Sequence, residues 1–94
     1  MFTTSATILT EQGQRLITRL GRHWGHKFDV TLSETELYIP FSATSHSRLT
    51  LNEGGLTAQI SAAEPERLST LKQVLTDHLQ RFAKDQTLVF PWSD

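Results

Sequence analysis

Residues 48–62 read RLTLNEGGLTAQISA, and this stretch decides the fold. On both sides of its centre apolar and polar residues alternate, which is the period of a strand with one buried face. Asn52-Glu53-Gly54-Gly55 joins the two arms, and because its glycines can take positive φ cheaply the sequence predicts a hairpin. The apolar residues of the two arms are Leu49, Leu51, Leu56, Ala58, Ile60 and Ala62.

The same alternation predicts four more strands, three before this hairpin and one after it. They are expected at residues 2–10, 27–32, 37–41 and 88–92. Pro40 and Pro91 lack the backbone amide that a central ladder requires, so we expect these two strands to lie at an edge or to end there.

Two segments have the 3.6-residue period of an amphipathic helix instead. The first runs from Glu11 to about Trp24, with Thr10 as its N-cap and Gly25 as the left-handed residue that stops it. The second begins at Pro65 and ends near residue 83. The apolar stripes are Leu16, Ile17, Leu20 and Trp24 in the first, and Leu68, Leu71, Leu75, Leu79 and Phe82 in the second.

The predicted order is therefore β-α-β-β-β-β-α-β. Because each strand alternates, the sheet needs a cover on one face only, and two helices supply it. We expect an α+β fold with one mostly antiparallel sheet and both helices packed on the same face. Its 94 residues suit a single domain, residues 1–94.

Composition excludes several functional classes. With no cysteine, thiol chemistry and thiolate metal sites are excluded. A net charge of -1 provides no general attraction for nucleic acid or anionic membranes. The N-terminus lacks the basic and apolar regions of a signal peptide, and no run of about 18 apolar residues occurs, so we expect a cytoplasmic protein.

Histidines near the ends of the two helices are the candidate site residues. His23 lies beside the apolar stripe of the first helix and His78 at the margin of the second, so both rings are expected to face one crevice, with His26 nearby. The imidazole nitrogens of His23, His26 and His78 form a candidate metal site, which suits zinc, iron or nickel. The alternative is structural: amphipathic histidines that bond to backbone or solvent at the edge of the core.

Charge is unevenly distributed along the chain. Residues 11–27 carry four positive charges and one negative, whereas residues 28–66 carry one positive and six negative. Arg15, Arg19 and Arg22 form a basic stripe on the first helix, and guanidinium groups bind carboxylate and phosphate well. A candidate ligand site therefore contains two histidines and three arginines: His23, His78, Arg19, Arg22 and Arg81. A solvated helix face is the alternative interpretation.

The uncovered face of the sheet is a second candidate surface. Its expected residues are Tyr38, His46, Arg48, Thr50, Thr57, Gln59 and Val89. This mixed set suits a protein partner or a second copy of the chain, or it simply faces water.

Several runs together resemble the bacterial family called domain of unknown function 2218. They are Arg15-Leu16, His23-Trp24-Gly25-His26-Lys27, Asp77-His78-Leu79-Gln80-Arg81-Phe82 and Thr87 to Trp92. Domains of that family are often encoded beside, or fused to, siderophore-interacting flavin reductases. The resemblance thus implies a link to iron-chelate handling and such a reductase as partner.

Three functions follow as hypotheses. The first is a non-enzymatic accessory domain of iron or siderophore metabolism that binds a metal, chelate or small anion near the two helices. The second is an interaction or homodimer module that uses the exposed sheet face. The third is an enzyme with His78 as general base, although the sequence indicates no nucleophile paired with it and no set of catalytic residues.

Overall fold

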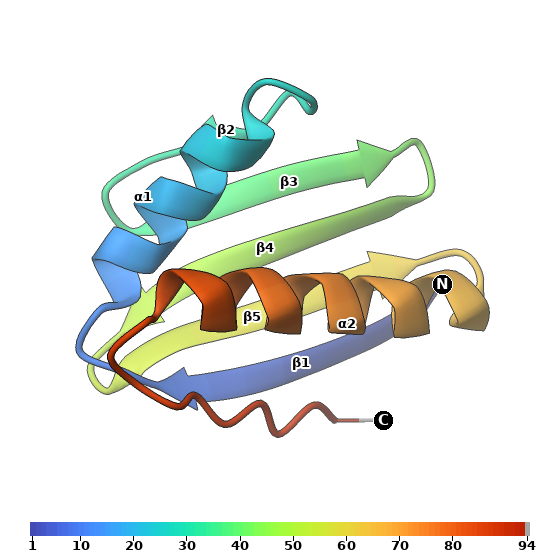
Figure 1. Ribbon diagram of the computed structural model, residues 1–94. Helices are drawn as coiled ribbons and strands as arrows, with labels where there is room; N and C mark the ends of the chain where they lie inside the picture. The colour runs from blue at the N-terminus through green and yellow to red at the C-terminus, as the bar shows by residue number, and fades with distance from the viewer. Residues whose placement is uncertain (94) are drawn as a thin grey trace.

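The structure, a computed structural model, describes residues 1–93. Five antiparallel strands form one sheet in the order β1-β5-β4-β3-β2 (Figure 1). The strands are β1 (Phe2–Leu9), β2 (Thr31–Leu32), β3 (Glu36–Ser42), β4 (Ser45–Asn52) and β5 (Gly55–Ala62). The helices are α1 (Gly13–Trp24) and α2 (Pro65–Phe82), and both lie on one face of the sheet. The predicted α+β class is confirmed.

The β4–β5 hairpin forms as predicted, with Leu49 opposite Ala58 and both side chains fully buried. The reason predicted for its glycines is wrong, because neither has positive φ. A Cβ on Gly55 would instead overlap the carbonyl oxygen of Ile8 in β1. Glycine is therefore required at this position by the close approach of two backbones.

The core lies between the sheet and the two helices. α1 contacts β2, β3 and β4, while α2 contacts β1 and β5, so the helices divide the sheet between them. The fully buried large side chains include Ile8, Leu20, Ile39, Leu49, Ile60 and Leu75. Within residues 1–93, no helix is long and apolar enough to cross a membrane.

The two ends of α1 differ from the prediction. The helix begins at Gly13 rather than Glu11, and its N-cap is Gln12 rather than Thr10, because the Thr10 hydroxyl accepts a hydrogen bond from the Gln12 amide at 3.0 Å and closes a turn first. Gly25 has right-handed helical angles, not left-handed ones. The turn continues beyond it, with the amide of Phe28 donating to Trp24.

This continued turn also shortens the predicted strand at 27–32. The amides of Lys27 and Phe28 both bond the carbonyl of Trp24, at 3.0 and 2.8 Å, so they are not available to a ladder. Only Thr31 and Leu32 pair with β3. Phe28 and Val30 still pack against the core, which explains part of the alternation, whereas Leu32 is exposed.

The strand predicted at residues 88–92 is not formed. This segment has no regular secondary structure. The Gln80 side chain of α2 takes its backbone bond instead, accepting from the amide of Leu88 at 2.8 Å. Pro91 contributes no amide to a ladder. The segment is thus attached to α2 rather than added to the sheet as a strand.

The tail curls at its end. The amide of Trp92 bonds back to the carbonyl of Phe90 at 2.8 Å, and its indole donates to the hydroxyl of Thr76 at 3.1 Å. The amide of Ser93 reaches the carbonyl of Ser5 in β1, at 2.9 Å. Both aromatic rings are half-buried and complete the core at this edge.

Candidate functional site

Aromatic rings from α1 and α2 meet where the helices approach each other. The ring centres of His23 and His78 lie 5.1 Å apart, and His78 lies 4.8 Å from Trp24. Phe82 completes the group, 5.7 Å from His23. The structure therefore brings together the two histidines for which the sequence predicts a common crevice.

One hydrogen bond sets the tautomer of His78. Its Nδ1 lies 2.8 Å from the carbonyl oxygen of Val74, one helical turn earlier. A carbonyl only accepts, so the neutral ring donates from Nδ1. The lone pair of a neutral ring is then on Nε2, and the ring is held against the helix.

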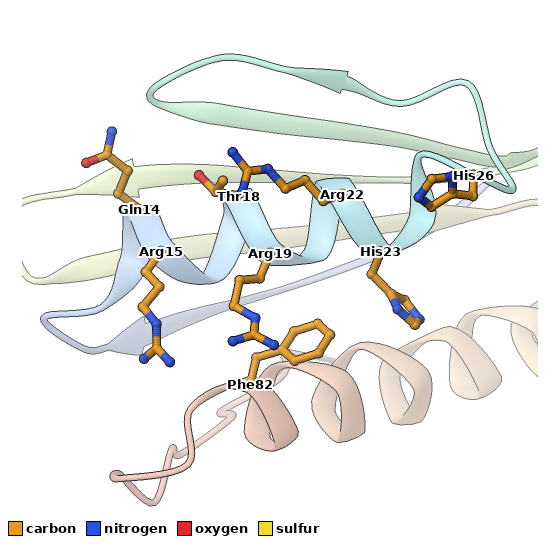
Figure 2. A pocket seen from close by; sticks show the side chains of 8 residues that line it. All are labelled: Gln14, Arg15, Thr18, Arg19, Arg22, His23, His26 and Phe82. Carbon is orange, nitrogen blue, oxygen red and sulfur yellow. The ribbon is translucent and has the colours of Figure 1, made fainter.

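An open hollow of about 850 Å³ lies over the outer surface of α1, and we call it the arginine hollow (Figure 2). Its lining residues are Gln14, Arg15, Thr18, Arg19, Arg22, His23, His26 and Phe82. Five of these are arginine or histidine and none is a carboxylate. Such a lining favours an anion.

The side chains in the arginine hollow point in two directions (Figure 2). Arg15, Arg19 and His23 are directed toward α2, where the guanidinium carbon of Arg19 lies 5.0 Å from the ring centre of Phe82. Arg22 and His26 lie on the flank away from α2. The arginine and histidine side chains that α1 contributes to the hollow are thus divided between two flanks of that helix.

A second hollow of about 500 Å³ lies on the other side of His23, and we call it the aromatic hollow. Its lining residues are His23, Trp24, Lys27, Phe28, Phe41, Arg67, Leu71, Val74 and His78. Lys27 and Arg67 are exposed, whereas Trp24, Phe41 and Leu71 are buried. The hollow therefore has an apolar floor, two cations at its surface and no carboxylate.

The three histidines do not form the predicted metal centre in this conformation. Among residues 1–93, no three histidine, aspartate or glutamate side chains are gathered so that they could hold a metal ion. His26 lies on the flank of α1 away from α2 and His78 (Figure 2). Arg81 lines neither hollow, although it is close enough to His23 to influence its pKa.

The uncovered sheet face has charged groups that pair with one another. Arg48 forms an ion pair with Glu36, and its guanidinium carbon lies 4.9 Å from the ring centre of Tyr38. The ring of His46 lies 5.5 Å from Tyr38. Val89, predicted on this face, lies outside the sheet in the C-terminal segment. Arg48 is therefore paired with a carboxylate, whereas no carboxylate lines either hollow on the helical side.

The sequence model of one bacterial family matches residues 5–93, which include every lining residue of both hollows. The chain belongs to the DUF2218 family. The family is described as an uncharacterized protein conserved in bacteria, so membership confirms the resemblance and leaves the function open. No curated protein matches the chain.

A solved structure supports the fold of this DUF2218 chain. It is the NMR structure of PA4090 from Pseudomonas aeruginosa, with a TM-score of 0.84 and 31% sequence identity. The similarity covers 99% of this chain and 96% of that one. The sheet with two helices on one face is therefore the architecture of both proteins.

Some residues of this DUF2218 site are not among those predicted from the sequence. The sequence places Lys27 in the histidine run and in the strand predicted at 27–32, and Phe82 in the apolar stripe of the second helix, so neither is predicted as a site residue. Arg67 and Phe41 carried none. They come from α2 and β3, and only the folded chain places them beside α1.

The pKa of His23 supplies a pH prediction. The His23 side chain is largely exposed, and the partial desolvation that it undergoes beside α2 lowers its pKa below the ordinary value, assisted by His78, Arg81 and His26. The unfolded chain therefore takes up a proton at higher pH than the folded one, so stability falls as the pH drops from the ordinary histidine pKa through the lowered one. We expect His23→Gln to reduce this loss, as measured by urea unfolding at neutral and acidic pH. His46→Gln is the control, and an unchanged pH slope in His23→Gln contradicts the prediction.

Proposed function

We propose that this DUF2218 domain is a small non-enzymatic accessory domain that binds an anionic ligand between α1 and α2. The observation that carries this proposal is the lining of the arginine hollow: three arginines, two histidines and no carboxylate. The chain as a whole is slightly acidic, at -1, so the concentration of positive charge is local. Local fields of this kind attract anions even when the net charge does not.

The geometry between the helices supports the proposal. Arg19 stacks near the Phe82 ring, which holds its planar guanidinium and leaves donors for a ligand. Arg15 lies one turn earlier on the same side, while its Nη1 donates to the side-chain oxygen of Gln12 at 2.6 Å. His23 adds a ring nitrogen on the same flank and gains a positive charge when it is protonated.

The proposal includes a link to iron metabolism. This link is supported by the association of similar domains with siderophore-interacting flavin reductases. Iron chelators bind ferric iron through hard oxygen donors, many of them anionic, so a chelate presents groups that arginine binds. An intact chelate or free chelator fits the lining better than a bare metal ion, because cations line the hollow. We place the domain in the cytoplasm, beside a siderophore-interacting flavin reductase.

Binding of citrate measured by calorimetry tests the anion site. We expect Arg19→Gln to weaken binding about fivefold, since one charge-assisted contact is lost. Binding should also weaken at high ionic strength, because the hollow is open to solvent.

Arg48→Gln is the matched control, because it removes the same charge from the opposite face of the molecule, where Arg48 pairs with Glu36. Absence of citrate binding, or equal loss in both variants, contradicts the proposed site.

A further inference from the structure

The arginine hollow and the aromatic hollow share one side chain. His23 lines both, with Arg19 and Phe82 on one side and Trp24 and Phe28 on the other. A ligand that spans His23 therefore contacts both hollows at once. The two hollows are therefore adjacent parts of one surface.

Rings connect the two parts without a break. The ring of Phe82 neighbours that of His23, which in turn neighbours His78, and His78 neighbours Trp24. Phe41 follows at 5.1 Å from Trp24, and Phe28 at 5.2 Å from Phe41, both edge to face. Edge-to-face packing holds such rings in fixed orientations. The floor of the aromatic hollow is thus a rigid apolar surface.

A simple hydrated anion makes no use of this floor. Trp24, Phe41 and Leu71 are at most 9% exposed, yet they line a hollow of about 500 Å³. That volume lies in the range of small-molecule pockets, which combine apolar walls with a few polar groups. Five of the polar lining residues are lysine or arginine: Lys27 and Arg67 in the aromatic hollow, and Arg15, Arg19 and Arg22 in the arginine hollow.

These five residues are more than half of the nine lysines and arginines in the chain, and neither hollow contains an acidic residue. We infer that the ligand is an aromatic acid, with its ring on the floor formed by Trp24 and Phe41 and its acidic group across His23 toward Arg19. This inference rests on the proposed anion site and narrows its ligand class.

The test compares three probes by amide NMR titration. 2-Naphthoate has the ring and the charge, acetate has only the charge, and 2-naphthamide has only the ring. We expect 2-naphthoate to bind about tenfold more tightly than either of the other two, because only it uses both hollows.

Two variants locate the ring. Val74→Glu adds a carboxylate to the wall of the aromatic hollow, and we expect it to weaken 2-naphthoate binding at least about tenfold. Ser69→Glu is the control, because it adds the same charge to an exposed position of α2 outside both hollows. Phe28→Leu keeps an apolar wall but removes one ring, and we expect it to weaken 2-naphthoate binding less than Val74→Glu does. It takes the place of Val74→Glu in the test if that variant fails to fold.

The outcomes separate the two proposals. Equal affinity for acetate and 2-naphthoate, both reduced by Arg19→Gln, overturns the aromatic acid and supports the anion site. Equal affinity for 2-naphthamide and 2-naphthoate overturns the acidic half of the inference. If neither 2-naphthoate nor citrate binds, the anion site and this inference both fail.

Discussion

Gly55→Ala is expected to destabilise the protein by about 3 kcal/mol, at the upper end of overpacking costs. A Cβ on Gly55 would overlap the carbonyl oxygen of Ile8 and lie 2.7 Å from the amide nitrogen of Thr10. Both are backbone atoms, and β1 cannot retreat without losing its pairing with β5 beside Ile8. The transition temperature should therefore fall by about 15 °C in a calorimetric scan.

Gly54→Ala is the matched control. Its added Cβ would lie 3.3 Å from Cδ2 of Leu9, the end of a side chain that is 72% exposed and can move. Neither glycine has positive φ, so alanine brings no conformational strain at either position. We expect a change below about 1 kcal/mol. Equal destabilisation of the two variants would show that the close approach of β1 is not what requires Gly55.

Leu75→Ala is expected to cost about 3 to 4 kcal/mol, as leucine deletions in a packed core do. Leu75 is fully buried on the face of α2 that covers the sheet, between Leu71 and Leu79 in the stripe. Its removal leaves a cavity in a domain whose total stability is about 5 to 15 kcal/mol. Urea unfolding should show a lower midpoint with an unchanged slope.

Leu9→Ala removes the same atoms from an exposed side chain and is expected to cost less than about 1 kcal/mol. A comparable loss in the two variants would mean that α2 does not cover the sheet in solution as it does here.

The parts of the fold that the sequence predicts well repeat one period over a long stretch. Leu71, Leu75 and Leu79 recur at helical spacing and are at most 2% exposed, so α2 follows from its stripe alone. The prediction fails where side chains or turns take the backbone bonds. Gln80 bonds the amide of Leu88 in the predicted last strand, and the turn after Trp24 takes the first amides of the predicted strand at 27–32.

The candidate site is predictable only in part. His23 and His78 each lie at the margin of an apolar stripe, and that position indicates the seam between two helices, where the structure places them. The flank occupied by Arg22 depends on the angle at which α1 crosses the sheet. Arg67 and Phe41 join the aromatic hollow from α2 and β3, and no local pattern indicates that contact.

Mapping amide shifts during a citrate titration tests the central claim most directly. Binding between the helices predicts that the largest shifts occur at Arg15, Arg19, His23 and Phe82, with Arg48 on the opposite sheet face unmoved. Shifts concentrated on the sheet face around Arg48, or none on α1, would contradict an anion site between α1 and α2.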